Sequence, residues 1–341
     1  MKTLRAIIPA LMLLAGELVA QEPARCLVVL VGDIMLGRGV AKEMERRGPH
    51  YPFSGIDLTA DSPAALVGNL ESLLTTAEFT SASPYRFKAD PVAGGKALAG
   101  AGFTFLSLAN NHSGDCGLGG LEESVFALNS LGIGWSGRLV APGVGNDGQA
   151  LTVSRPAFAE RAGVRIGFLA FCQPYLLGYP DLAPADSALL WRSIAAIRDS
   201  CQIIIASFHW GQEYQLLPTR RQRYLARLAV RAGASLVHGH HPHVLQGFEF
   251  YRGGLIAYSL GNYVFDQRDS LPNQSAVLKV VFRGPTLDSA WLEPVQIAEK
   301  SPRPLARHNY RRFRRHLDSL NAPFGTRSRW AERGLCLLPG P

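Results

Sequence analysis

The segment Leu27-Val28-Val29-Leu30-Val31-Gly32-Asp33 decides the fold, because a short apolar run ends there in a glycine and a carboxylate. A continuous apolar run of this length, bounded by a turn, is typical of a strand buried on both faces. The same pattern recurs at residues 65–67 before Gly68-Asn69-Leu70-Glu71, at 103–108 before Asn110-Asn111-His112, at 203–206 before His209, and at 236–237 before the histidine cluster 238–243.

Helical patterns lie between several of these runs, at about residues 39–47, 91–101, 119–131, 187–200 and 219–232. Strands alternating with helices predict an α/β sheet with crossover connections. Beyond His243 the pattern changes, and strands are expected at 244–251, 255–259 and 276–282, with Gly253-Gly254 as a hairpin turn. The second half of the chain therefore adds a more antiparallel sheet.

The composition is that of a globular protein, with 341 residues, 47% hydrophobic and 18% charged. A disordered chain, a collagen and a coiled coil are excluded. No apolar run reaches the roughly 18 residues that a membrane-spanning helix needs, which excludes a polytopic membrane protein.

The net charge of +8 is concentrated at the C-terminus, since residues 302–341 hold nine arginines against Asp318 and Glu332 while residues 21–301 are neutral overall. We expect residues 301–341 to form a basic, Arg-rich tail, in which the segment Arg311-Arg312-Phe313-Arg314-Arg315-His316 is either a surface helix or a disordered arm. Such a tail could hold a polyanion through counterion release, or lie on an anionic membrane surface. A solvated helix without a partner is the alternative.

The first 20 residues are typical of a secretory signal, with Lys2 and Arg5 before a short apolar stretch that ends at Ala20. A membrane anchor that is not cleaved is the alternative. Export would place the protein in the periplasm or at the cell envelope. The five cysteines are widely spaced, so they predict neither a disulfide framework nor a cysteine zinc site.

The polar clusters all follow strands, and open α/β sheets bind ligands at the carboxyl ends of their strands. Carboxylate, amide and imidazole donors without a thiolate suit zinc, manganese or iron better than calcium. The sequence therefore predicts a site for one or two divalent transition metals. The candidate ligands are Asp33, Glu71, Asn111, His209, His241 and His243, with His238 and His240 in orienting roles.

His112 and Asp115 are candidate catalytic residues, because an imidazole beside a metal can protonate a leaving group and a carboxylate can orient it. The alternative is a turn that caps the following helix, with Asp115 as a solvated carboxylate. The glycine-rich segment 143–148 matches the GxGxxG pattern, but no strand precedes it and no helix follows it, so a loop is expected.

Six segments carry a family resemblance: Gly32-Asp33-Ile34-Met35-Leu36, Gly68-Asn69-Leu70-Glu71, Ala109-Asn110-Asn111-His112 with Asp115, His209-Trp210-Gly211-Gln212-Glu213-Tyr214, Gly239 through Gln246, and Tyr258 through Gln267. Together they resemble the CapA family of capsule synthesis, also called the poly-γ-glutamate biosynthesis family. This family is a branch of the calcineurin-like metallophosphoesterases. The resemblance implies a four-layer α/β/β/α sandwich with mixed sheets over residues 21–300.

The resemblance also implies roles for the candidate ligands. Glu71 looks like the carboxylate that bridges two metals, with Asp33 and His243 facing one of them. Residues Asn111, His209 and His241 would face the other metal. The chain departs from the superfamily at Met35, where a histidine ligand is usual, and Glu71 stands where aspartate is usual, so one metal site has fewer ligands.

Two functions are compatible with these residues. The first is an exported metal-dependent hydrolase, in which a metal activates water and His112 protonates the leaving group of a phosphorylated small molecule or of an anionic polymer of glutamate. The second is a non-catalytic component that binds a polyanion or helps to assemble the machinery of capsule synthesis and export. The export signal and the neutral domain argue against a nucleic-acid enzyme.

Overall fold

The structure is a computed structural model that describes residues 24–140, 152–267 and 271–340. The expected signal at 1–20 and the glycine-rich segment 143–148 lie outside the described residues. Within the described part, no helix combines the length and the apolar character that crossing a bilayer requires.

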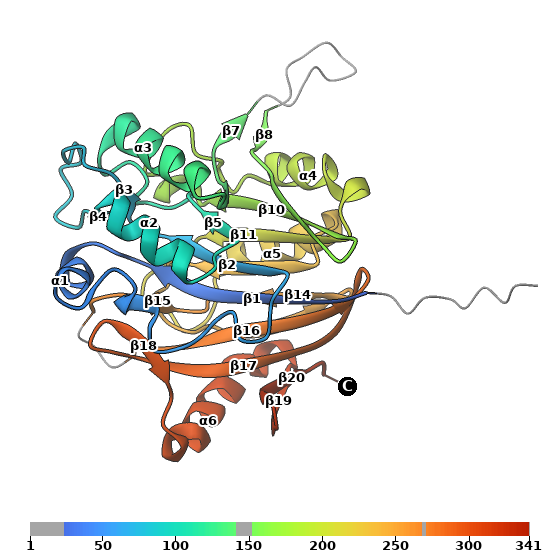
Figure 1. Cartoon of the computed structure of the whole chain (residues 1–341). Helices are drawn as coiled ribbons and strands as arrows, with labels where there is room; N and C mark the ends of the chain where they lie inside the picture. Colours follow the sequence, from blue (N-terminus) through green and yellow to red (C-terminus); the bar gives the residue numbers. More distant parts are fainter. Residues whose placement is uncertain (1–23, 141–151, 268–270, 341) are drawn as a thin grey trace, which may run out of the picture.

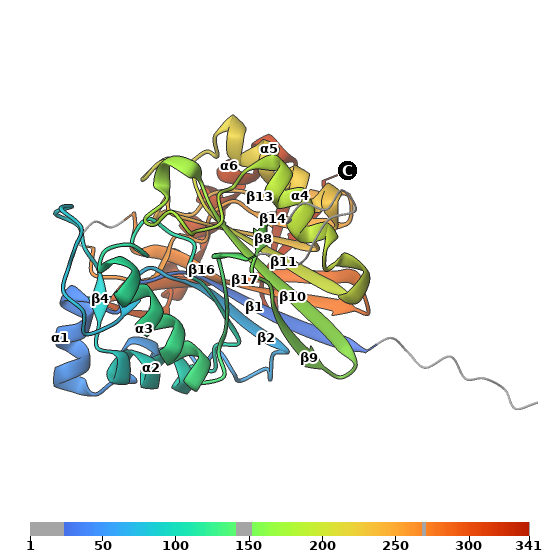
Figure 2. The same cartoon turned by 90° about the horizontal axis from the view of Figure 1, so that it is seen from above.

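Two β-sheets lie face to face, and helices cover their outer faces (Figure 1, Figure 2). In the described part, the larger sheet runs in the order β19 (Arg327–Ala331), β20 (Gly334–Leu338), β17 (Thr286–Ala298), β16 (Gln274–Arg283), β1 (Arg25–Ile34), β2 (Ala65–Leu70), β5 (Phe105–Ser107) and β6 (Gly134–Ser136), with β15 (Asn262–Val264) on β1 and β18 (Ser301–Pro304) on β17. The smaller sheet runs in the order β13 (Phe248–Tyr251), β14 (Gly254–Ala257), β12 (Leu236–His240), β11 (Ile203–His209), β10 (Val164–Cys172) and β9 (Ala157–Arg161).

Two pairs of short strands, six α-helices and five 3-10 helices of three residues each complete the described elements. The short pairs are β3 (Leu73–Leu74) with β4 (Lys88–Ala89), and β7 (Leu139–Val140) with β8 (Val153–Ser154). The helices are α1 (Arg38–Arg47), α2 (Pro91–Gly100), α3 (Gly117–Ser130), α4 (Ser187–Ala195), α5 (Arg220–Ala232) and α6 (Tyr310–Asn321).

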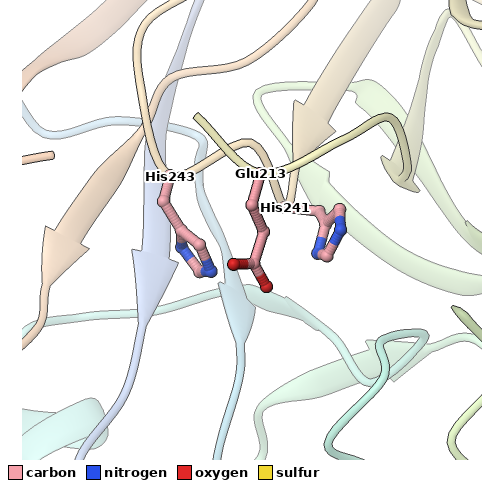
Figure 3. A group of neighbouring side chains, drawn as sticks. All are labelled: Glu213, His241 and His243. Atoms are coloured by element: carbon pink, nitrogen blue, oxygen red, sulfur yellow. The ribbon is translucent and has the colours of Figure 1, made fainter. Parts of the chain in front are cut away.

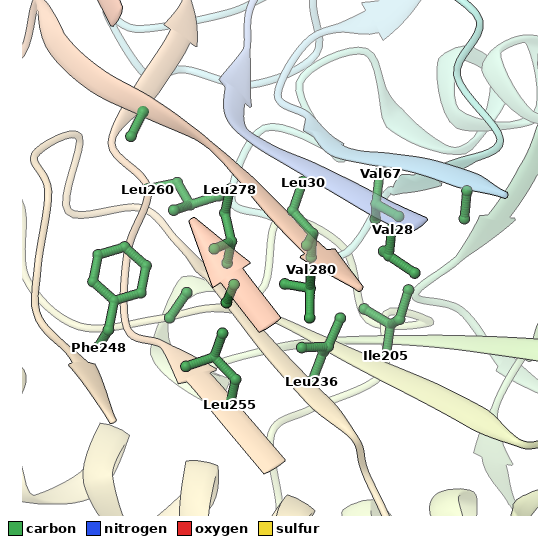
Figure 4. Close-up of a cluster of buried hydrophobic side chains, with 14 of the residues drawn as sticks. Val28, Leu30, Val67, Ile205, Leu236, Phe248, Leu255, Leu260, Leu278 and Val280 are labelled. Carbon is green, nitrogen blue, oxygen red and sulfur yellow. The ribbon is translucent and has the colours of Figure 1, made fainter. Parts of the chain in front are cut away.

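The core has three apolar layers because successive side chains of a strand point to opposite faces. Val28 and Leu30 of β1 join Ile205 and Leu236 of the smaller sheet in the layer between the sheets (Figure 4). Val29, the neighbour of Val28, packs outward with residues of α1, α2 and α3. The outer face of the smaller sheet packs in the same way against α4 and α5. The continuous apolar runs of the sequence follow from this burial on both faces.

Local signals set the helix boundaries. Asp90 caps α2 by accepting hydrogen bonds from the N–H groups of Val92 and Ala93. Thr219 and Gln222 cap α5 reciprocally, each side chain bonding the other residue's backbone N–H. Gly233, with φ 126°, ends α5 in a conformation that a side chain would strain.

The predicted four-layer α/β/β/α sandwich with mixed sheets is confirmed, as are the five expected helices to within a few residues. The hairpin at Gly253-Gly254 is present between β13 and β14. The sequence analysis did not single out β10 or β17, although both lie inside the sheets. All five cysteines lie in the described part and are unpaired.

Residues 301–340, which the sequence analysis sets apart as a basic tail, are packed into the fold. Strands β18 and β20 both pair with β17. Phe313, Leu317 and Leu320 of α6 are buried in the layer between the sheets. Of the two conformations expected for Arg311–His316, the structure has the helix, because an apolar side chain recurs every three or four residues among the arginines of α6.

This packing predicts that Phe313→Ala destabilises the whole protein by about 3–5 kcal/mol, the usual cost of truncating a buried phenylalanine. Urea unfolding followed by circular dichroism measures the change. Arg315→Ala on the exposed face of the same helix is the control and should change the free energy of unfolding by less than about 0.5 kcal/mol. Equal stability of Phe313→Ala and the parent would mean that α6 is not part of the cooperative unit.

Candidate metal centre

The candidate ligands come together at one edge of the two sheets, where the parallel strands end. Asp33 lies near the end of β1, and Glu71 follows β2 directly. His209 is the last residue of β11, and His241 and His243 follow β12. Each of these side chains is at most 5% exposed. Two sheets that face each other thus bring together residues more than 200 positions apart.

Glycine allows the backbone to pack closely where two of these ligands are held. A Cβ on Gly32 would lie 1.8 Å from the carbonyl oxygen of Gly261, and one on Gly239 would lie 1.9 Å from that of Tyr258. No side chain fits at such distances. The close approach at Gly32 lets the N–H of Asp33 donate to the oxygen of Gly261 at 2.9 Å.

The Asp33 carboxylate is surrounded by donors from both sheets. Asn69 Nδ2 donates to Asp33 Oδ1 at 2.8 Å, and the backbone N–H of His241 donates to Asp33 Oδ2 at 3.3 Å. His243 Nδ1 lies 3.5 Å from Asp33 Oδ2. Burial alone would raise the pKa of Asp33, but hydrogen bonds from His240 and His243 outweigh it and hold the pKa well below its usual range.

Glu71 is the opposite case. Burial, together with the nearby Asp33 charge, raises the pKa of Glu71 well above its ordinary value. Its Oε1 lies 3.6 Å from His243 Nε2 and 3.9 Å from His112 Nε2, yet it has no hydrogen-bond partner among the described residues. A buried carboxylate oxygen without a donor is costly, and a cation would remove that cost.

Two histidines of the site, His209 and His241, are held in the neutral form, whereas the pKa of His243 shifts the other way. Burial, with a smaller contribution from His241, lowers the pKa of His209 well below its usual range. Burial, followed by the charge of His243, lowers the pKa of His241 to about 3. Burial would also lower the pKa of His243, but the hydrogen bond with Asp33 outweighs it and the net shift is upward. Neutral imidazoles and ionised carboxylates are the forms that bind metals.

Two overlapping groups of side chains could hold a divalent metal. Asp33, Glu71 and His243 form the first group, and Glu213, His241 and His243 form the second. Within each group, the donor atoms lie within 4.8 Å of one another. Figure 3 shows the Glu213 carboxylate between the two imidazoles. Because Oε1 of Glu71 and Nδ1 of His241 are buried without partners in the described part, the residues fit a divalent metal.

The other predicted ligands lie beside these groups. His209 Nε2 is 2.7 Å from Asn111 Oδ1, and the rings of His209 and His241 are 4.7 Å apart between centroids. His238 and His240 are fully buried behind them. His238 Nε2 donates to the carbonyl oxygen of Val31 at 2.8 Å, and His240 Nδ1 lies 3.2 Å from Asp33 Oδ1.

His112 and Asp115 form a buried pair, which differs from the alternative of a solvated Asp115. His112 Nδ1 lies 2.9 Å from Asp115 Oδ2, and the same oxygen accepts the Phe87 N–H at 2.7 Å. The ring of Phe87 packs on the imidazole at 3.9 Å between centroids. Asp115 therefore orients His112, and His112 Nε2 is left facing Asn111 and Glu71.

Met35, which occupies the position of a usual histidine ligand, is fully buried in the outer apolar layer with α1, α2 and α3. Its sulfur accepts the N–H of Gly37 at 3.1 Å. The side chain belongs to the core and contributes nothing to the donor groups.

Sequence reasoning missed three residues of the site. Asn69 stands two positions before Glu71, and the two-residue period of a strand could have placed both on one side. Glu213 lies in the same short segment as His209, but its exposed position gave no signal. Asn262 accepts from His243 Nδ1 at 2.8 Å, and only the pairing of β15 with β1 brings it there.

The backbone at two of the histidines is strained. His241 has φ 91° and His243 has φ 57°, in a region that residues with a side chain seldom adopt. Such strain persists only where the surroundings impose it, and it is concentrated at functional sites.

The comparisons with known proteins identify the family of this chain. The sequence model of the family described as bacterial capsule synthesis protein PGA_cap matches residues 27–267. This chain belongs to that family.

Two relatives of known name extend the match beyond the family region. The chain is 30% identical to the capsule biosynthesis protein CapA of Bacillus anthracis, over 84% of this chain and 71% of the relative. It is 31% identical to the PGA biosynthesis protein CapA of Bacillus subtilis (strain 168), over 81% and 72%. The expected CapA relationship is confirmed.

A solved structure supports the fold. The crystal structure of a novel phosphatase from Mycoplasma pneumoniae superposes with a TM-score of 0.54 over 80% of this chain and 94% of the phosphatase. The identity is 11%, so the likeness concerns the arrangement of sheets and helices.

The low pKa of His241 predicts a pH-dependent stability of the chelated protein. Between its folded pKa of about 3 and the unfolded value near 6.5, the unfolded chain binds the proton more readily. Lowering the pH from about 7 to about 5 should therefore lower the free energy of unfolding of the parent, relative to that of His241→Asn, by about 2 kcal/mol. Urea unfolding in EDTA at the two pH values measures this.

The control is His308→Asn, which replaces an exposed histidine outside the cluster and should show no such relative change. If the stability of the parent relative to His241→Asn stayed constant or rose towards acid, that would contradict the burial of a neutral His241.

Proposed function

We propose that this chain is an exported, metal-dependent hydrolase that acts in the biosynthesis of capsule or poly-γ-glutamate. The observation that carries the proposal is the buried His112–Asp115 pair directed at a group of partnerless ligand atoms. A purely structural core would have no reason to leave Glu71 Oε1 unpaired and next to an oriented imidazole. The relatives named for capsule and PGA biosynthesis support the biosynthetic part of the proposal.

Asp33, Glu71 and His243 would hold one divalent metal, and Glu213 and His241 would extend the site to a second one. A divalent transition metal supplies Lewis-acid polarisation and makes water a nucleophile near neutral pH. Manganese, zinc and iron all suit this mixture of carboxylate and imidazole donors.

The chain's own residues handle the proton of the leaving group. Asp115 holds Nδ1 of His112, so the proton that His112 gives up is the one on Nε2. Phe87 covers one face of the imidazole and keeps water from that side. The reaction class is hydrolysis of a phosphoester or of an amide in an anionic polymer, with one water consumed and the leaving group protonated.

The experiment is to purify the protein without chelators or a His tag, measure its transition-metal content by mass spectrometry, and screen phosphoester and poly-γ-glutamate hydrolysis. We expect the parent to carry metal and His241→Ala/His243→Ala to lose both metal and activity. His112→Ala should keep its metal and lose about 10²–10⁴-fold in rate, the usual contribution of a positioned acid.

His308→Ala, an exposed histidine outside the site, is the matched control and should keep both metal and rate. Two results would contradict the hydrolase proposal. One is a metal content near zero that added manganese, zinc and iron do not restore. The other is full activity of His112→Ala on every substrate that the parent cleaves. The chain would then be a non-catalytic binding or assembly component on the same scaffold, as the core position of Met35 would suggest.

Export rests on the basic and apolar pattern of residues 1–20. We expect the full chain produced in a bacterial host to reach the periplasm or the cell envelope, and a version without residues 2–20 to stay in the cytoplasm. Cell fractionation with immunodetection measures this, using a cytoplasmic and a periplasmic marker enzyme as controls. Equal distribution of the two versions would refute export by this segment.

A further inference from the structure

The exposed arginines of α6 form one surface of the molecule. Arg311, Arg312 and Arg315 are exposed, and none of them makes an ion pair with another described residue. Arg314 alone on this helix pairs, with Asp318 at 3.4 Å. The helix lies beyond residue 267, where the family match ends.

The fold turns these arginines outward. Phe313 and Leu317 occupy the buried face of α6, so residues at positions 311, 312 and 315 fall on the opposite face. Asn321 fixes the end of the helix, since its Oδ1 accepts the N–H of Phe248 at 2.8 Å. The arginines therefore sit on a rigid element and not on a free arm.

A second arginine-bearing helix meets α6 at Phe324, in the turn that follows α6. The guanidinium of Arg223 in α5 lies 5.6 Å from the centroid of this ring, which stacks on Tyr258 at 4.9 Å. Arg220 and Arg221, at the start of α5, are also exposed. Figure 2 shows the two helices on the same side of the molecule.

The start of α5 is close in sequence to the candidate metal centre. The loop that leads from β11 to α5 carries Glu213, whose carboxylate lies with His241 and His243. The start of α5 therefore follows a loop that takes part in the candidate metal centre.

We propose that this α6 arginine surface, formed by Arg311, Arg312 and Arg315 with Arg223 of α5 near its end, binds an anionic polycarboxylate chain such as poly-γ-glutamate. The assignment deepens the proposed function and rests on it for the choice of polymer. Arginine binds carboxylates with paired N–H donors, and release of counterions from a charged polymer adds to the affinity.

The surface favours a soluble polymer over a membrane. A helix that binds at the lipid interface presents large apolar side chains to the bilayer. The large apolar residues of α6 are instead buried in the protein, and none of the exposed large apolar side chains of the described residues lies on this helix.

The test measures binding of fluorescently labelled poly-γ-glutamate to the purified full chain by anisotropy, from low to physiological salt. EDTA is present, so that hydrolysis does not interfere. The triple variant R311Q/R312Q/R315Q should bind about tenfold more weakly at low salt, as the loss of three exposed ion pairs implies, and depend less steeply on salt.

The control triple K96Q/R161Q/R192Q removes three exposed positive charges from α2, β9 and α4, and should bind within about twofold of the parent. Equal weakening of both triples would reduce the effect to net charge and overturn the proposal. The proposal would also be overturned if the α6 triple bound the polymer as tightly as the parent, or if the parent did not bind it. The same holds if the α6 triple lost binding only to phosphatidylglycerol vesicles, measured in parallel, and not to the polymer.

The readouts separate this surface from the hydrolase. The α6 triple should keep the metal content of the parent, and the His241→Ala/His243→Ala variant should keep its polymer binding in EDTA. If the chain binds polymer through α6 but neither holds metal nor hydrolyses substrate, the proposal for the arginine surface stands and the hydrolase proposal is refuted.

Discussion

The buried carboxylate of Asp33 is the group on which the site depends. It lies on β1 in the larger sheet, yet the N–H of His241 and the ring of His243 reach it from the smaller one. An ionised carboxylate without water is stable only when donors surround it, so this group ties the two sheets together at their shared edge. Asn69 completes the shell from the neighbouring strand.

The need of Asp33 for hydrogen-bond partners also explains the glycines around it. The N–H of Asp33 can reach the oxygen of Gly261 only because Gly32 has no side chain. On the other sheet, Gly239 allows the backbone of β12 to approach Tyr258 before the chain turns through the strained residues His241 and His243. Close packing and local strain together hold the imidazoles over the carboxylates.

The position of Glu71 shows how one charge sets the state of another. Asp33 keeps its charge because histidines stabilise it, and that charge helps to raise the pKa of Glu71. Two carboxylates so close together repel each other in a dry interior, and a divalent cation is the partner that would let both ionise. The same argument gives Glu213 a place in the site although it is exposed.

Most of the elements and most of the candidate ligands could be predicted from the sequence. Apolar runs that end in Asp33, Glu71 or His209 are local signals, and burial on both faces of a strand is the physical reason that they are continuous. Which donors meet depends on the tertiary structure. Glu213 and Asn262 join the site through a loop and a strand pairing that no periodicity encodes, and α6 became part of the core because the sheets left an apolar face for Phe313 and Leu317 to cover.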